Sequence, residues 1–208
     1  QTTSMTYDGN GNLTKVTYPD GRSIAYAYDS ENRRTLLSDS DGYQTGYTYN
    51  GQGLLSAVTD GTRTLIEYSY DGSGNLIQQK NANGTYTLYT YAGENLSSIR
   101  NYDAAGSLIS SFSYSYNSDH LVSAMTDDSG TWRYSYDESG QLISTEAPDG
   151  TVTSYVYDAA GNRLQVTAHG ETTRYSVNGM NQYTGYGNVT RAYDGDGNLL
   201  QETKDGQT

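Results

Sequence analysis

Residues Tyr7-Asp8-Gly9-Asn10-Gly11-Asn12-Leu13 decide how this chain folds, because a segment of the same design recurs along nearly its whole length. The recurrences begin at Tyr28-Asp29, Tyr49-Asn50, Tyr70-Asp71, Tyr91-Ala92, Tyr116-Asn117, Tyr136-Asp137, Tyr157-Asp158 and Tyr193-Asp194. Successive tyrosines are 21, 21, 21, 21, 25, 20, 21 and 36 residues apart. A fixed period is the sequence signature of a repeat array. We therefore expect residues 1–208 to form one continuous array, irregular at about 92–115 and 175–192.

The composition predicts a thin structure in which tyrosine does most of the packing. Hydrophobic residues make up 34% of the chain, against roughly 45–50% in typical globular proteins. There are 23 Tyr but only 1 Phe and 1 Trp. A tyrosine offers apolar area together with a hydroxyl that can stay in water, which suits a sheet whose two faces are both wet. Aromatic residues placed regularly in every repeat argue against disorder.

Charge and residue content exclude several classes of function. A net charge of -12 argues against a nucleic-acid partner, since phosphate binding requires a basic surface. The absence of Cys removes disulfides, thiolate metal sites and cysteine nucleophiles. The chain has no apolar run of about 18 residues that could span a membrane. Gln1 starts in the middle of the pattern, so we expect the chain to be a piece of a longer protein.

The segment before each tyrosine motif alternates between large and small residues, which is the period of a β-strand. The large residues are Ile24, Tyr26 and Tyr28; Ile66, Tyr68 and Tyr70; Phe112, Tyr114 and Tyr116; and Trp132, Tyr134 and Tyr136. Small or polar residues such as Ala25, Glu67 and Ser115 stand between them. Each such strand is predicted to carry an aromatic face and a thin polar face.

Turns rich in Gly, Asn and Asp separate these strands from shorter ones that begin at Leu13, Leu55, Leu76, Leu142 or Leu199. The far ends of the strands carry Pro19-Asp20-Gly21, Asp60-Gly61, Asn83-Gly84 and Pro148-Asp149-Gly150. Asp-Gly and Asn-Gly tolerate the positive φ that tight hairpin turns require. The sequence thus predicts an all-β repeat array of antiparallel β-hairpins, about 21 residues per unit.

Two segments depart from this rhythm. At Tyr91-Ala92 the motif decays, and Tyr102-Asp103 adds another copy, which predicts a register change or a lengthened hairpin. Near the carboxyl end, the segment from Tyr175 to Tyr183 stands where the next motif is due. We interpret that segment as a degenerate unit, followed by a shortened unit before Tyr193.

These recurrences resemble YD repeats, the units of bacterial Rhs proteins, insecticidal toxin-complex shell proteins and animal teneurins. The segment Asn178-Gly179-Met180-Asn181-Gln182-Tyr183 and the motif at Tyr193 also resemble a stretch common in bacterial Rhs cores. The resemblance implies a single-layer sheet that coils into part of a YD-repeat shell or barrel. In bacterial members the shell commonly encloses a carboxy-terminal toxin. The motif that closes the bacterial core and releases its toxin is absent here, so enclosure is an expectation for the parent protein.

The residues assigned to this repeat motif have a structural role in our interpretation. They are Tyr7, Asp8, Tyr28, Asp29, Tyr49, Tyr70, Asp71, Tyr91, Tyr116, Tyr136, Asp137, Tyr157, Asp158, Tyr193 and Asp194. Asp8, Asn10 and Asn12 alternate as in the start of a calcium loop, but Leu13 takes the place of the required glycine. The aspartates are better explained as caps of turns. We expect no metal and no cofactor.

No motif points to catalysis. His120 and His169 are the only histidines, and both fall in turns that are expected to be exposed. Trp132 and Tyr134 are a possible pair for stacking on a ligand such as a sugar, although Trp132 also fits the packing position of Ile24 and Ile66. We therefore expect that the chain is not an enzyme.

Three functions are carried forward from the sequence. The leading hypothesis is a structural segment of a large secreted or surface bacterial protein, a section of a β-shell that encloses or displays a toxin or effector domain. The alternatives are an extracellular binding or adhesion module for carbohydrate or a cell surface, and a surface fibre that assembles through its strand edges. All three place the chain outside the cell or on its surface.

Overall fold

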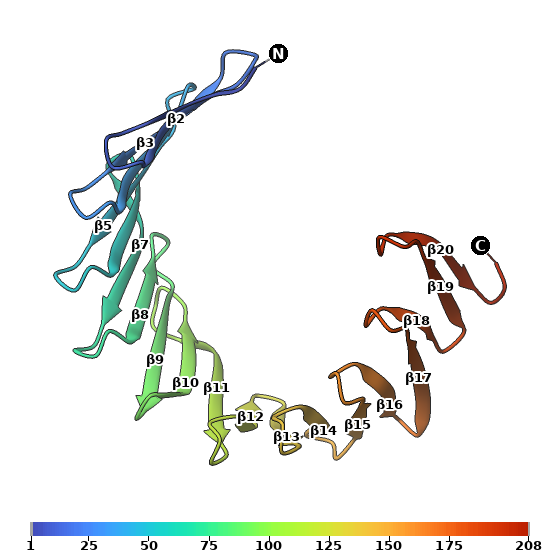
Figure 1. The fold of residues 1–208 in the computed structure, drawn as a ribbon. Helices are drawn as coiled ribbons and strands as arrows, with labels where there is room; N and C mark the ends of the chain where they lie inside the picture. The colour runs from blue at the N-terminus through green and yellow to red at the C-terminus, as the bar shows by residue number, and fades with distance from the viewer. Residues whose placement is uncertain (1, 208) are drawn as a thin grey trace. The chain divides into compact units, whose positions relative to one another are not determined.

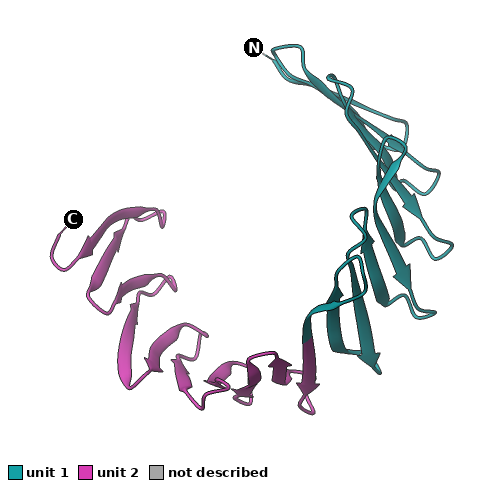
Figure 2. Cartoon of the chain, turned by 180° about the vertical axis from the view of Figure 1, so that it is seen from behind, with its two compact units in different colours: residues 1–111 teal, residues 112–208 magenta. Residues whose placement is uncertain are grey.

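The computed structural model describes residues 2–207 of the chain. The chain forms two compact units, residues 1–111 and 112–208, which Figure 2 colours separately. All regular elements of the described residues are β-strands, and every pairing within each unit joins neighbours in sequence in antiparallel orientation. The predicted all-β hairpin architecture is therefore confirmed.

Unit 1 is a meander in which each strand pairs with the next one along the chain (Figure 1). Its strands are β1 Ser4–Tyr7, β2 Leu13–Thr17, β3 Ser23–Tyr28, β4 Arg34–Asp39, β5 Gln44–Tyr49, β6 Leu55–Asp60, β7 Arg63–Tyr70, β8 Leu76–Asn81, β9 Tyr86–Ala92 and β10 Asn95–Tyr102.

Unit 2 repeats the same plan, starting within β11 and continuing to β20. Its strands are β11 Leu108–Tyr116, β12 Val122–Asp127, β13 Gly130–Tyr136, β14 Leu142–Glu146, β15 Val152–Tyr157, β16 Arg163–Ala168, β17 Glu171–Val177, β18 Tyr183–Tyr186, β19 Val189–Tyr193 and β20 Leu199–Lys204.

The alternation seen in the sequence translates directly into burial along the strands. On β7, Ile66, Tyr68 and Tyr70 are half-buried, whereas Glu67 and Ser69 are exposed. Successive side chains of a strand point to opposite faces, so the aromatic residues of each repeat gather on one face. The aromatic face lies only partly covered because no second layer packs against it within either unit.

Neither unit has a conventional core. Among the described residues, the only apolar side chains classed as buried are Val16, at 7% exposure, and Val189, at 5%. Large apolar residues such as Tyr43 and Leu200 stay 72% and 67% exposed. Stability must therefore come largely from the backbone ladder and from partial burial between neighbouring strands, because a single layer has no interior.

A β-bulge precedes the tyrosine at the end of the first strand in nearly every repeat. The register shifts between Ser69 and Tyr70, and Tyr70 then pairs with Leu76, the first residue of the following strand. The same shift occurs before Tyr28, Tyr49, Tyr136 and Tyr157. Bulges bend a strand and increase its twist. The predicted strand starts at Leu13, Leu55, Leu76, Leu142 and Leu199 are confirmed.

The first irregular segment is a lengthened hairpin, one of the two possibilities predicted from the sequence. Ala92 follows Tyr91 in place of a capping aspartate, and β9 runs on to a two-residue turn at Gly93 and Glu94. Gly93 supplies the positive φ, 63°, that this turn requires. The Tyr102-Asp103 copy then forms the next turn of the ordinary kind, in which the Asp103 N–H bonds to the Ser107 carbonyl at 2.9 Å.

The second irregular segment is a repeat in which the motif tyrosine is replaced. Val177 pairs with Tyr183 after a register shift, so Val177 occupies the position of the repeat tyrosine. Asn178 begins the turn, and Asn181 takes the place of glycine with a φ of 60°. Tyr175, two residues before Val177, holds the place that Tyr68 holds before Tyr70.

The turn after Tyr70 gives a test of backbone strain with a control inside the same turn. Gly74 has a φ of +88°, whereas Gly72 has no positive φ and has open space where a Cβ atom would point. Gly74→Ala should lower the free energy of unfolding by about 1–2 kcal/mol, since an L side chain is strained in the left-handed region. Urea unfolding of the full chain measures this. Gly72→Ala should change stability by less than about 0.5 kcal/mol, and an equal loss in both variants would contradict the assignment.

Candidate functional site

The turn that follows the repeat tyrosine recurs along the chain with polar side chains in the same positions. In the turn after Tyr70, the Asp71 Oδ1 atom accepts the N–H groups of Ser73 and Asn75, both at 2.9 Å. The Asp71 Oδ2 atom accepts the Asn75 side-chain amide at 2.9 Å. The Gly74 N–H closes the turn on the Asp71 carbonyl at 3.1 Å. One carboxylate thus organises a five-residue turn.

The same pair of bonds, from the N–H groups two and four residues later to one side-chain oxygen, recurs along both units. The residues that accept these bonds are Asp8, Asp29, Asn50, Asp103, Asn117, Asp137, Asp158, Asn178 and Asp194. Asparagine serves as well as aspartate at this position, so the geometry requires an oxygen acceptor and not a charge.

Where the residue is aspartate, these hydrogen bonds also stabilise the ionised form. The side-chain amide of Asn75, followed by its backbone N–H, holds the pKa of Asp71 below its ordinary value. For Asp29 the largest contribution to its lowered pKa is the backbone N–H of Arg33, whose side chain also binds the carboxylate. Hydrogen bonds to a carboxylate favour its charged form. These turns are therefore coupled to pH even though their carboxylates lie at the surface.

The repeat tyrosines connect each repeat to the repeat before it. The Tyr70 hydroxyl donates to the Leu55 carbonyl at 2.8 Å, fifteen residues earlier. Leu55 is the first residue of the strand after the preceding turn, so the bond joins two consecutive repeats. Equivalent bonds run from Tyr28 to Leu13, Tyr49 to Arg34, Tyr91 to Leu76, Tyr136 to Val122 and Tyr157 to Leu142. We call this bond the tyrosine lock.

Two of these hydroxyls are shielded from water. Partial burial raises the pKa of Tyr70 and of Tyr91 above the ordinary value. The rings are half-buried against the neighbouring strand. Each tyrosine that forms the lock therefore contributes both apolar contact and a hydrogen bond.

The remaining motif tyrosines show how the lock varies. Tyr7 is 57% exposed and its hydroxyl contacts the Met5 sulfur at 3.5 Å. Tyr116 ends β11 and pairs in register with Val122. Tyr193 forms a shorter version of the lock, since its hydroxyl donates to the Tyr183 carbonyl at 3.0 Å, ten residues earlier.

The predicted stacking pair, Trp132 and Tyr134, lies on one face of β13, but the two rings do not line the same hollow. Trp132 lines a shallow depression with Ser129, Ala147, Pro148 and Asp149. Tyr134 lies outside that set, and burial raises its pKa. Of the two rings, Trp132 alone lines this depression.

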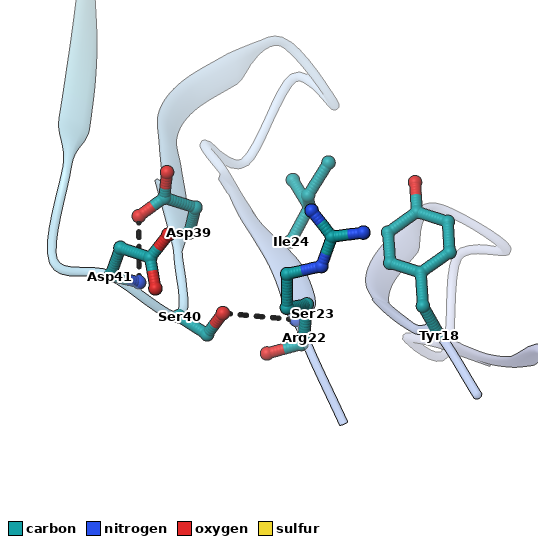
Figure 3. Close-up of a pocket in the computed structure, with 7 residues that line it drawn as sticks. All are labelled: Tyr18, Arg22, Ser23, Ile24, Asp39, Ser40 and Asp41. Atoms are coloured by element: carbon teal, nitrogen blue, oxygen red, sulfur yellow. Dashed lines mark hydrogen bonds between the residues drawn. The ribbon is translucent and has the colours of Figure 1, made fainter. Parts of the chain in front are cut away.

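Another hollow, of about 380 Å³, lies between two turns of unit 1. It is lined by Tyr18, Arg22, Ser23, Ile24, Asp39, Ser40 and Asp41 (Figure 3). Its polar groups bind one another: the Asp41 N–H donates to Asp39 Oδ1 at 2.9 Å, and the Ser23 N–H donates to Ser40 Oγ at 3.3 Å. Such satisfied turn residues place no activated nucleophile beside a base.

The two histidines, the other candidates for chemistry, do not share a turn. His120 and His169 are exposed in different turns, with φ of 61° and 51° in place of glycine. Within residues 2–207, no group of three or more His, Cys, Asp or Glu side chains is arranged to hold a metal ion. The same residues include no helix of the length and apolarity needed to cross a membrane.

Comparison with known proteins finds similar repeats in parts of the chain. The RHS Repeat family model matches residues 7–42 and 136–173. The chain is 37% identical over 73 residues to the tRNA nuclease WapA of Bacillus subtilis strain 168 and to the tRNA3(Ser)-specific nuclease WapA of Bacillus spizizenii. The aligned part covers 33% of this chain and only 3% of either relative.

Solved structures share the fold at low sequence identity. The Tc holotoxin pore of Photorhabdus luminescens matches with a TM-score of 0.72 at 15% identity, covering 93% of this chain. The TcdB2-TccC3-TEV and TcdB2-TccC3-Cdc42 structures each match with a TM-score of 0.75 at 15% identity and cover 95% of this chain. This chain spans 14% of the length of each of those proteins.

The tyrosine lock can be tested by removing a single oxygen. Tyr70→Phe deletes the donor to the Leu55 carbonyl while keeping the ring. The free energy of unfolding should fall by about 1 kcal/mol, because one intramolecular hydrogen bond is lost and its acceptor is left without that partner. Chemical denaturation of the full chain measures the change. The matched control is Tyr43→Phe at a position 72% exposed, which should leave stability unchanged; equal losses would refute the lock.

The capping aspartates predict a loss of stability in acid. Because folding lowers the pKa of Asp71, its contribution is fully present above the unfolded pKa and is lost as the pH falls through the folded value. Asp71→Asn keeps an oxygen acceptor, as Asn50 does, and should flatten the decline of unfolding free energy below about pH 4. Urea titrations at a series of pH values test this. Asp128→Asn, which removes an exposed carboxylate, should keep the original pH dependence.

Proposed function

Since the RHS Repeat model matches residues 7–42 and 136–173, we propose that the chain is a section of a β-shell in a large secreted or surface bacterial protein. In this proposal the shell encloses or displays a toxin or effector domain of the parent chain. The observation that carries the proposal is the single-layer sheet itself: both of its faces are wet, and its only apolar side chains classed as buried among residues 2–207 are Val16 and Val189. Such a sheet is suited to act as a wall.

The chemistry of the described residues favours a structural role over catalysis. The recurring polar groups are the capping Asp or Asn and the tyrosine hydroxyl, and each is engaged in turns or between repeats. WapA is a tRNA nuclease by name, but only 73 residues of this chain align with it, and they cover 3% of its length. The net charge of -12 also weighs against contact between this segment and RNA. We therefore assign no nuclease chemistry to these residues.

The structural relatives support a partner of a particular kind. The matched solved structures are Tc toxin components, including TcdB2-TccC3 with either TEV or Cdc42 in its name. We take an enclosed or displayed domain of the parent chain as the partner, outside the cell or at its surface. In this proposal the chain also associates with other copies by pairing through its strand edges, which single-layer sheets leave open.

A carbohydrate-binding role is the second candidate, and the hollow beside Trp132 is the observation that favours it. A tryptophan ring at an open depression is suited to stacking on a sugar. It ranks second because the depression holds one such ring and Tyr134 does not join it.

Protease protection of the native parent protein tests the enclosure. The domain outside the repeats should resist trypsin under conditions that digest the same domain when it is expressed alone. A parent protein that carries Gly74→Ala together with Tyr70→Phe should lose part of that protection, because both changes weaken the repeat sheet. Cleavage of the domain at the same rate in the parent and alone would refute enclosure and leave display or adhesion as the function.

A further inference from the structure

Strands β16 to β19 of unit 2, which are labelled in Figure 1, carry an arginine-capped stack of tyrosines. The Arg163 guanidinium lies over the Tyr175 ring at 4.6 Å, and the Arg191 guanidinium lies over the Tyr186 ring at 5.0 Å. The two rings between them are stacked with centroids 6.0 Å apart. Guanidinium groups within about 6 Å of an aromatic face are attracted by the ring. The order of the stack is therefore Arg163, Tyr175, Tyr186, Arg191.

The stack surrounds a small hollow. Tyr183 meets Tyr175 edge to face at 5.5 Å, and together with the four stacked residues it lines a space of about 260 Å³. Pockets for drug-sized ligands usually measure roughly 300–1,000 Å³. The hollow is therefore suited to one group about the size of a side chain.

The two arginines differ in their electrostatic partners. The Arg191 Nε atom forms an ion pair with Glu202 at 2.7 Å. Arg163 forms no ion pair with any carboxylate of residues 2–207; its Nη2 atom donates to the Tyr175 hydroxyl at 3.3 Å. Its Nε atom is buried without a hydrogen-bond partner among the same residues, so a ligand in the hollow would meet the Nη groups. No carboxylate of the described residues thus balances the charge of Arg163, although the chain has a net charge of -12.

The unbalanced charge of Arg163 indicates the chemistry of the occupant. A guanidinium presents planar N–H groups that match a carboxylate. The Tyr175 and Tyr186 rings stack on each other and each has a guanidinium over it, which leaves less ring surface for stacking on a neutral sugar. A polyanion would be repelled by the acidic chain, whereas one carboxylate would meet little such opposition.

From these observations we infer that the hollow binds one carboxylate side chain, Asp or Glu, of a partner polypeptide. Arg163 is the main anchor, and Arg191 adds a second positive group that it shares with Glu202. The identity of the partner rests on the proposed function, in which this sheet faces an enclosed or displayed domain. The inference adds a specific polar contact between the wall and that domain.

A peptide titration of the full 208-residue chain tests the site. The probes are acetyl-Gly-Glu-Gly-amide, the same peptide with Gln in place of Glu, glucuronate and inorganic phosphate. NMR signals of the arginine side-chain N–H groups report binding. The Glu peptide should shift the Arg163 signal with saturation, and the Gln peptide should not. Arg163→Gln should weaken binding at least about tenfold, since charge-assisted hydrogen bonds are the strong ones.

Two further variants separate a binding site from a general effect of charge or folding. Arg163→Lys keeps the charge but loses the planar fork, so it should also bind more weakly than the parent chain. Arg174→Gln removes a positive charge from the exposed opposite face of β17 and should leave binding unchanged. Circular dichroism checks that every variant is folded.

The inference is overturned by any of three results. The first is an equal shift with the Glu and Gln peptides. The second is saturation by phosphate or glucuronate where the Glu peptide has no effect. The third is a loss of affinity in Arg174→Gln equal to that in Arg163→Gln. Because the titration uses the isolated chain, its outcome is independent of protease protection in the parent protein. Failure of the carboxylate site can thus be told apart from failure of the enclosure.

Discussion

The hydrogen bond from most repeat tyrosines to the carbonyl about fifteen residues earlier is the interaction on which the rest of this structure depends. A sheet of one layer cannot bury a core, and only Val16 and Val189 are classed as buried among the apolar residues of positions 2–207. Neighbouring hairpins must then be held by the backbone ladder and by side chains that reach across it. Tyrosine meets this need because its ring covers the neighbouring strand and its hydroxyl binds the first carbonyl of a strand in the preceding repeat. This explains a composition with 23 Tyr and 1 Phe.

The lock works only if each turn sets the register, and this is the task of the capping residue. A slip of one residue would move every side chain of a strand to the other face. Asp71 and its equivalents fix five residues by accepting two backbone N–H groups, and the bulge before the tyrosine absorbs the difference in length between the strands. The presence of Asn50 and Asn117 in the same role shows that register needs the acceptor, while the charge of aspartate adds a dependence on pH.

Much of the fold follows from the sequence because its causes are local. Alternation predicts the strands, and Gly74 or Asp8 predicts a turn from backbone geometry alone. The bulges and the tyrosine lock were not predicted, since they depend on which residues face each other across strands. The sequence shows a degenerate repeat at 175–183, but the strand register was needed to place Val177 in the motif position. The stack of Arg163 and Tyr175 required the positions of four strands, which no single period reveals.

The degenerate repeat shows how the array tolerates the loss of a lock. Val177 has no hydroxyl, so the ordinary bond to the start of β16 cannot form. Tyr183 compensates by accepting the Arg163 backbone N–H at 2.9 Å, while its own carbonyl accepts the hydroxyl of Tyr193. The connection between neighbouring repeats is retained, but it is now made by a tyrosine from the opposite side of the turn. Tyr175 keeps the ordinary place two residues before the motif position and lies under the Arg163 guanidinium, so the repeat that departs from the pattern also gains a distinct surface chemistry.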